Sequence, residues 1–169
     1  GVAYKAKILP LKGFGNYSTD LAGGIDYVTQ LYQEGVLDSV VINNSWGRTG
    51  DGYSLSFKDV FDYAYEAGVI NVNAAGNSFG RSILRGYSFH SKMIVVGNSA
   101  IDDKRSSSSS YGTMVDVVAP GTSTLSTVPG NNYGYKTGTS MASPHVTGLV
   151  ALILENHPEY TIEDIRSIL

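Results

Sequence analysis

The sequence has 169 residues, of which 42% are hydrophobic and 16% are charged, and its formal net charge is −3. This balance excludes a disordered chain and predicts one globular domain with a core of its own. The mildly acidic charge, with no cluster of basic residues, argues against nucleic acid as a partner.

The first part of the chain predicts a strand, a helix and a second strand. A short apolar run at 6–11 predicts the first strand, and 18–35 has the apolar spacing of a helix with Ser18 or Thr19 as its cap. The apolar face of this helix consists of Leu21, Ile25, Val28 and Tyr32. The β-branched run at 38–43 predicts a strand that is buried on both faces.

The rest of the chain continues the alternation. Residues 56–68 predict a second helix, whose inward positions are Val60, Phe61, Ala64 and Tyr65. Three further strands are expected at 69–75, 93–100 and 114–120. A long apolar helix then begins within 135–148, and a short last helix begins near Thr161. Strands separated by helices pair in parallel with right-handed crossovers, so we predict a three-layer α/β/α fold with a mostly parallel sheet.

Other segments restrict the class of protein further. The longest apolar run is far shorter than the roughly 18 residues that indicate a membrane span, so none is expected. The first residues, GVAYKAKILPLKG, carry charges inside their apolar part and do not resemble a signal peptide, so we interpret the chain as a piece of a longer one. The serine run at 105–112 is too short for a disordered tail and predicts a surface loop or edge segment. Cysteine is absent, which excludes disulfides and thiolate chemistry.

Polar residues follow three of the predicted strands at the point where each strand ends. These segments read NNSWG, GNSFG and GTSTLS. In an open parallel sheet, ligands bind beyond the carboxyl ends of the strands. The segments supply serine and asparagine but no metal ligands, which is the inventory of an acyl-transfer site.

Ser140 stands where the long apolar helix begins, and two interpretations compete for it. A serine at a helix amino terminus has unpaired backbone N–H groups and a favourable dipole beside it, and Gly138 leaves room for a substrate backbone. Alternatively the serines there only cap the helix. Local rules favour Ser143 as the N-cap with Pro144 at the first helical position, and on these signals alone capping is the stronger interpretation.

A nucleophilic serine needs a base, and no histidine in the sequence is a convincing one. Five residues along a helix correspond to a rotation of about 140° beyond a full turn, so His145 points away from Ser140. His157 precedes Pro158 at a helix end, where the helix dipole accounts for it, and His90 is expected in a loop.

A competing motif is GNSFG at 76–80, which matches the G-x-S-x-G nucleophile elbow of α/β-hydrolases. Ser78, Asp116 and His145 would then follow the hydrolase order. The elbow requires a helix directly after it, and residues 81–92 do not predict one. This hydrolase reading is therefore kept only as an alternative.

The segment GTSMASPH at 138–145 resembles the nucleophile segment of the subtilisin-like serine endopeptidases, the subtilases, residue for residue. Four other segments resemble parts of the same family in the same order, namely GVAYKAKI, INNSWG, NAAGN and VDVVAPG. The resemblance therefore spans nearly the whole chain. It implies that Pro144 lies inside the nucleophile helix, which overrules Ser143 as its cap.

The resemblance also implies roles for single residues. Ser140 would be the nucleophile and Asn77 the side-chain donor of the oxyanion hole. Ser45, Trp46 and Gly47 would pair with the substrate main chain and line one side of the pocket. Ala74, Ala75 and Gly76 would form the other wall of the S1 pocket. Trp46 is a departure from the family, which more often has leucine there.

The main departure is an absence. Subtilases carry their triad in the order Asp, His, Ser, and this sequence contains neither the Asp nor the His segment. We therefore interpret residues 1–169 as a partial peptidase domain that is inactive alone, and we expect self-association, aggregation or a partner segment to cover its exposed sheet surface. A catalytically dead subtilase-like binding module is the second alternative.

The resemblance further implies partners and location. The substrate would be a polypeptide, and no cofactor is expected. Structural calcium occurs in the family, but no site for it is identifiable here, and no metal-binding residue is assigned. Subtilases are usually exported, which implies an extracellular or cell-surface location.

Overall fold

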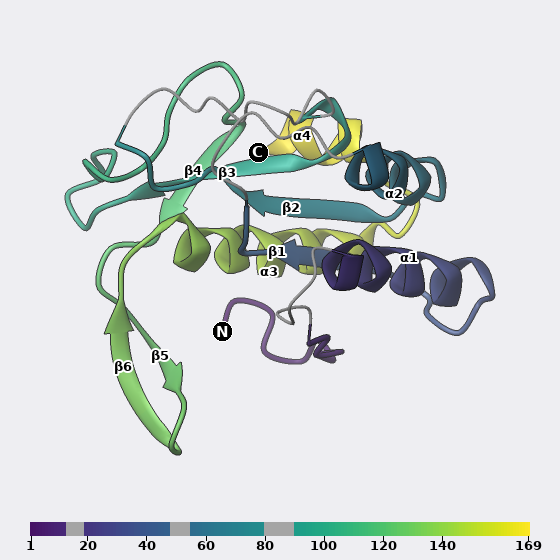
Figure 1. Cartoon of the computed structure of the whole chain (residues 1–169), viewed down its shortest axis with the longest axis horizontal. Coiled ribbons are helices and arrows are strands. Elements are labelled where there is room, and N and C mark those ends of the chain that lie inside the picture. The colour runs from purple at the N-terminus through teal and green to yellow at the C-terminus, as the bar shows by residue number, and fades with distance from the viewer. Residues whose placement is uncertain (13–18, 48–54, 80–89) are drawn as a thin grey trace.

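The computed structural model describes residues 1–12, 19–47, 55–79 and 90–169, and its centre is a parallel sheet with the strand order β1-β2-β3-β4 (Figure 1). The strands are β1 (Val41–Asn44), β2 (Ile70–Ala74), β3 (Ile94–Ser99) and β4 (Val117–Pro120). Each strand pairs in parallel with its neighbour, as expected where helices connect successive strands. The strands predicted around these four segments are confirmed.

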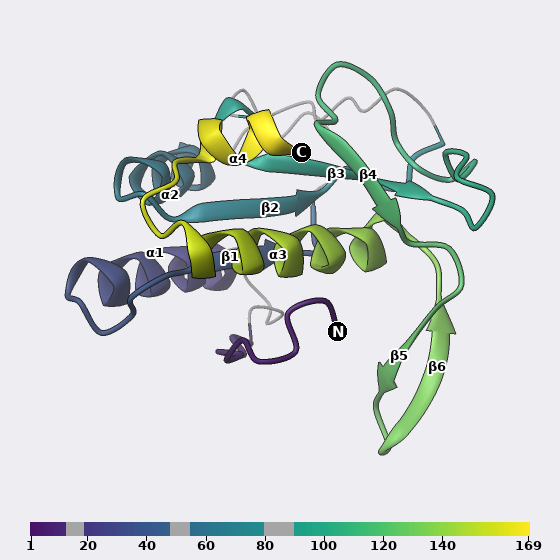
Figure 2. The same cartoon turned by 180° about the vertical axis from the view of Figure 1, so that it is seen from behind.

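Helices cover both faces of this sheet, so the fold has three layers (Figures 1 and 2). The helices α1 (Thr19–Gln33) and α2 (Leu55–Glu66) pack on one face, and α3 (Thr139–Asn156) and α4 (Ile162–Ile168) pack on the other. Neighbouring residues of β3 serve the two faces in turn, because side chains alternate along a strand. Val95 belongs to the core beneath α1 and α2, whereas Ile94 and Val96 belong to the core beneath α3. The predicted three-layer α/β/α fold is confirmed.

Two strand predictions differ from the structure. The apolar run at 6–11 forms no strand, and its residues are exposed, including Ile8 at 86%. An apolar run forms a stable strand only where a neighbouring strand supplies hydrogen bonds, and no described residue does so here. The second difference concerns β1, which is an edge strand of the described sheet and is only partly buried, not buried on both faces as predicted.

An antiparallel hairpin was not predicted from the sequence. Its strands β5 (Thr124–Val128) and β6 (Asn132–Lys136) project from the body of the molecule and end just before α3 (Figures 1 and 2). Gly130 and Asn131 in its turn have φ angles of 86° and 54°, a conformation that these two residue types tolerate. The segment PGNN between two short polar and aromatic runs is the signal that could have found it.

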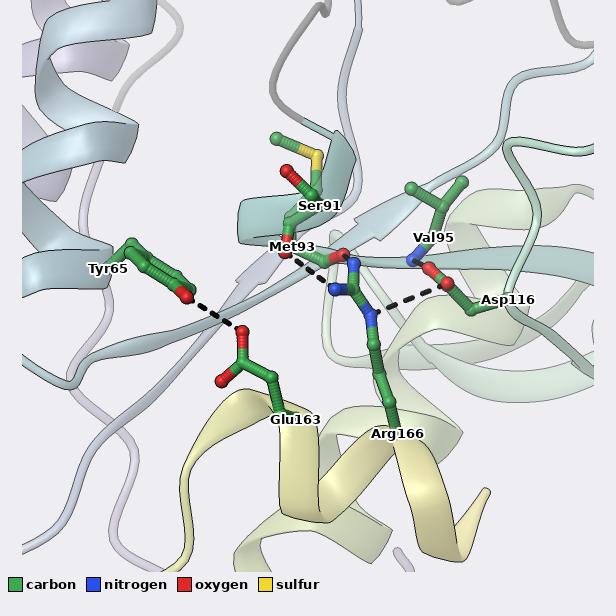
Figure 3. Close-up of polar contacts among 7 residues, drawn as sticks. All are labelled: Tyr65, Ser91, Met93, Val95, Asp116, Glu163 and Arg166. Carbon is green, nitrogen blue, oxygen red and sulfur yellow. Dashed lines mark hydrogen bonds and ion pairs between the residues drawn. The ribbon is translucent and has the colours of Figure 1, made fainter.

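The last helix lies against the segments that precede β3 and β4, at the amino ends of these two strands (Figure 3). Thr161 caps α4 through a capping box with Asp164, as the predicted start near Thr161 requires. Arg166 then donates to the backbone oxygens of Ser91 and Met93, and its Nε lies 3.4 Å from Asp116 Oδ1. These bonds fasten α4 to the end of the sheet where β3 begins.

The helices of the described residues are all too short or too polar to cross a membrane.

Candidate active site

Three segments meet at the carboxyl edge of the sheet. Residues 45–47 follow β1, residues 76–78 follow β2, and the first turn of α3 lies against both. The sheet edge is where an open α/β fold binds ligands, because the loops there are free to vary while the strands fix their origins. The predicted site residues are thus brought together from positions almost a hundred residues apart.

Ser140 is the second residue of α3 and is joined to Ser45 by two hydrogen bonds. The Ser140 hydroxyl donates to the backbone oxygen of Ser45 at 3.0 Å, and the Ser45 hydroxyl donates to the backbone oxygen of Ser140 at 2.9 Å. The side chain of Ser140 is therefore directed toward the end of β1. Its N–H is among the first four of the helix, which have no partner within the helix.

Asn77 lies on the other side of the helix start, and its amide has a defined orientation. Its Oδ1 accepts hydrogen bonds from the Thr139 N–H at 3.0 Å and from the Thr139 hydroxyl at 3.3 Å. The Thr139 hydroxyl also accepts from the Gly76 N–H at 3.1 Å. Because the oxygen of the amide is used in this way, its NH₂ group is left as a donor beside Ser140.

Glycine at 138, the N-cap of α3, allows the Asn77 amide to approach this closely. A Cβ at position 138 would lie 3.3 Å from Asn77 Nδ2 and 3.4 Å from its Oδ1. The Gly138 N–H donates to the backbone oxygen of Gly121 at 2.8 Å, which ties the helix start to the loop after β4. The helix start is thus fixed from the β2 side and from the β4 side.

The other residues with predicted binding roles lie around these two. The ring of Trp46 packs on Phe57 and Phe61, with ring centroids 5.3 and 6.3 Å away, so its side chain belongs to the core layer beneath α2. Gly47 is exposed, whereas Ala74 and Ala75 are buried at 8% and 2%. Binding of substrate by Ser45, Trp46, Gly47, Ala74, Ala75 and Gly76 stays a prediction.

Neither His145 nor His157 is placed to act as a base for Ser140. His145 Nδ1 lies 2.9 Å from the backbone oxygen of Met141, one turn back along α3, which agrees with the angular argument from the sequence. His157 stacks on Tyr160 at the far end of α3, about 25 Å from Ser140 along the helix axis. His90 begins the short 3₁₀ helix η1 (His90–Lys92), which precedes β3 at the opposite edge of the sheet.

The hydrolase alternative fails on geometry. Ser78 follows β2 at the carboxyl edge, whereas Asp116 precedes β4 and accepts a hydrogen bond from the Val95 N–H at 2.7 Å (Figure 3). Ser78 lies at the carboxyl ends of the strands and Asp116 at their amino ends, so the two side chains cannot share one histidine. The helix that an elbow at Ser78 needs would fall in 80–89, outside the described residues.

The cap that local rules favoured is wrong. Ser143 lies inside α3, is fully buried, and donates to Asn43 Oδ1 at 2.8 Å. Pro144 is also inside the helix, as the family resemblance implies. Pro144 is the sixth residue of α3, so it lacks the N–H that would bond the Ser140 backbone oxygen, and that oxygen accepts from the Ser45 hydroxyl instead.

Three polar residues of this site were missed from the sequence. Thr139 orients the Asn77 amide, and Asn43 accepts from Ser143 while donating to the Ser45 hydroxyl at 2.9 Å. Ser110 in the serine run donates its N–H to the backbone oxygen of Gly76. Polar residues beside a nucleophile motif are the only sequence signal for them, and pairing across 30 to 100 residues gives no local pattern.

Among the described residues, no group of three or more acidic or histidine side chains is placed to hold a metal ion.

Comparison with known proteins agrees with this geometry. A profile described as the subtilase family matches residues 1–169. The chain belongs to the subtilase family. Subtilisin DY of Bacillus licheniformis is 41% identical over 167 residues, which cover 97% of this chain and 58% of the relative. Subtilisin amylosacchariticus of Bacillus subtilis subsp. amylosacchariticus is 40% identical over 166 residues, which cover 96% of this chain and 41% of the relative.

A solved structure supports the same assignment. The crystal structure of a cold adapted subtilisin-like serine proteinase superimposes with a TM-score of 0.82 at 31% sequence identity. That match covers 100% of this chain and 61% of the other. This subtilase chain thus spans about two fifths to three fifths of the length of these three relatives.

Proposed function

We propose that this chain carries the nucleophile and the oxyanion hole of a serine endopeptidase. The observation that carries the proposal is the joint placement of Ser140 and Asn77. Ser140 lies at a helix amino terminus, and the Asn77 amide oxygen is bonded to the neighbouring Thr139, which leaves the NH₂ group as the donor end of that amide. Family membership over the full chain supports the same chemistry.

The chemistry follows from this arrangement. The Ser140 oxygen attacks the carbonyl carbon of a peptide bond, and the carbonyl oxygen becomes an oxyanion. The Ser140 N–H and the Asn77 Nδ2 donate hydrogen bonds to that oxyanion, and the positive end of the α3 dipole adds to its stabilisation. The peptide amine leaves, and water then hydrolyses the acyl-enzyme ester on Ser140.

The proton from the Ser140 hydroxyl requires a base, and we propose that a histidine and its aspartate partner come from a segment outside these 169 residues. His145 bonds back along α3 and His157 lies at the far end of that helix, and the Asp, His, Ser order of subtilisin places the two missing residues upstream. The chain alone is then inactive. The partly buried strand β1 lies at the edge of the described sheet, where an upstream strand, or a second copy, would pair.

The substrate of the whole enzyme is, on this proposal, a polypeptide, and its location is extracellular or on the cell surface. Both follow from the subtilisins that the chain matches. No cofactor takes part in the proposed steps.

The test uses the chain joined to the upstream segment that supplies the histidine and aspartate. Ser140→Ala should abolish peptide hydrolysis, whereas Ser78→Ala should keep most of it. Loss of activity with Ser78→Ala and retention with Ser140→Ala would establish the hydrolase alternative. Peptide binding without turnover in the unmodified protein would establish the binding module instead.

A further inference from the structure

The serine loop, defined here as residues 105–111, lies between β3 and β4 and has an internal structure. Arg105 organises it, because its guanidinium donates to the backbone oxygens of Ser106 at 3.1 Å and Ser109 at 2.7 Å. The same guanidinium lies 4.6 Å from the centre of the Tyr111 ring. Low sequence complexity therefore does not mean disorder here, and Ser109 and Ser110 are buried at 0% and 3%.

This loop contacts the oxyanion segment on both sides of Asn77. The Ser110 N–H donates to the backbone oxygen of Gly76 at 2.9 Å, and the Ser78 N–H donates to the Ser110 hydroxyl at 3.3 Å. One buried serine thus bonds the residue before Asn77 and the residue after it. One residue further on, the Phe79 N–H donates to the backbone oxygen of Ser108 at 3.3 Å.

The neighbouring serine has a different partner, although its burial is the same. The Ser109 hydroxyl accepts from the N–H of Asn98 at 2.9 Å, within β3, and donates to the backbone oxygen of Ser110 at 3.0 Å. Ser109 thus fastens the loop to the sheet, whereas Ser110 fastens the oxyanion segment to the loop. The chain supplies its own matched control.

We propose that Ser110 is a positioning residue for the oxyanion hole, acting through Asn77. Asn77 itself is exposed and follows the end of β2, so no packing against the core fixes its backbone. Thr139 fixes the side-chain oxygen, and Ser110 fixes the backbone on either side. Both are needed, because a donor must lie within a few tenths of an ångström of its productive place to stabilise an oxyanion. This inference rests on the proposed function.

The role predicts a specific kinetic effect. Ser110→Ala removes the acceptor for the Ser78 N–H while the backbone bond to Gly76 stays. Because the oxyanion forms only in the transition state, a displaced Asn77 lowers kcat and leaves KM unchanged. We expect kcat to fall about fivefold, the change that corresponds to the usual net contribution of one hydrogen bond.

The experiment is a double-mutant cycle in the chain joined to its upstream segment. The variants are Ser110→Ala, Asn77→Ala and the pair, and kcat is expressed per active site labelled by a serine-directed fluorophosphonate at completion. If Ser110 acts through Asn77, Ser110→Ala lowers kcat in the parent and has no further effect once Asn77 is alanine. Ser109→Ala, the control, loses an equally buried hydroxyl but keeps that of Ser110, so it should lower stability while lowering kcat per labelled site less than Ser110→Ala does.

Two results would overturn the inference. An equal fall in kcat in both backgrounds would mean that Ser110 does not act through Asn77. A fall in stability with unchanged kcat would mean that Ser110 only supports the fold. Neither result affects the proposed function, which fails instead if Ser140→Ala keeps its activity.

Discussion

Replacing Gly121 by alanine would test how tightly the start of α3 is fixed. A Cβ at this position would lie 2.6 Å from Asn98 Oδ1 and 2.6 Å from the backbone oxygen of Gly138. Ordinary contacts of a Cβ begin at 3.4 Å, so each of these two neighbours must retreat by about 0.8 Å, the difference between 3.4 and 2.6. The amide side chain can rotate away, but the Gly138 oxygen belongs to the backbone two residues before Ser140.

The expected result has two parts. Overpacking of this kind lowers the free energy of unfolding by about 1–3 kcal/mol. Because the Gly138 N–H also donates to the Gly121 oxygen, the shift reaches the nucleophile, and a displacement approaching 1 Å lowers kcat/KM by up to about 100-fold. The measurements are urea unfolding and kcat/KM per labelled active site, on the chain joined to its upstream segment.

Two further variants make the test specific. Gly23→Ala lies within α1, where a Cβ meets nothing within 4 Å, so it should raise stability by about 0.5–1 kcal/mol through helix propensity alone. Adding Asn98→Ala to Gly121→Ala removes the side-chain contact and leaves the backbone contact, so stability should recover in part while activity stays low. A Gly121→Ala protein with the stability and activity of the parent would refute the reasoning.

Three other predictions follow from the site and from α4. Asn77→Leu should lower kcat by about 10²–10³ with little change in KM, the loss known for removal of the corresponding amide in subtilisin, a relative of this chain; a loss of stability with kcat unchanged would make Asn77 a turn residue only. The 169-residue chain alone should not be labelled at Ser140 by a fluorophosphonate, and should be labelled after refolding with its upstream segment; stoichiometric labelling of the chain alone would reveal a base within it. Hydrogen bonds from Thr161 lower the pKa of Asp164, so the capping contribution is complete above the ordinary pKa of the carboxyl and is lost as the pH falls through the folded-state pKa. Asp164→Asn should therefore show a smaller fall in Tm than the parent from about pH 6 to about pH 2, and an unchanged fall would exclude the cap as a source of acid sensitivity.

The fold could be predicted because most of its strands and helices have a hydrophobic pattern that a short stretch of sequence already shows. The runs around β2 and β3 are continuous and β-branched, and those strands are buried as the pattern requires. The run at 6–11 is also apolar but lacks a partner strand among the described residues, and pairing is a property that no local window contains. The hairpin of β5 and β6 is polar and exposed, so hydrophobic periodicity could not reveal it.

In the site, too, features with a local sequence signal could be predicted and features that depend on long-range contacts could not. A specific eight-residue motif predicts Ser140 as the nucleophile, whereas helix-capping rules alone pointed to Ser143 as the cap, which is instead buried within α3. Those rules score side-chain caps, but the N-cap here is Gly138, with no side-chain hydrogen bond, and its place is set by long-range bonds to Gly121. The partners that orient Asn77 come from Thr139 and the serine loop, and only the folded chain brings them together.

The single tryptophan of the sequence gives this site an optical reporter. Trp46 follows Ser45, whose backbone oxygen accepts from Ser140, and its ring packs on two phenylalanines of α2. Its fluorescence, excited beyond the tyrosine band, therefore comes from one place in the molecule. A shift of that emission to longer wavelength would signal water reaching the layer beneath residues 45–47, without any added dye. Refolding with a segment that supplies the proposed histidine and aspartate can thus be followed at residues 45–47 while Ser140 is still unlabelled.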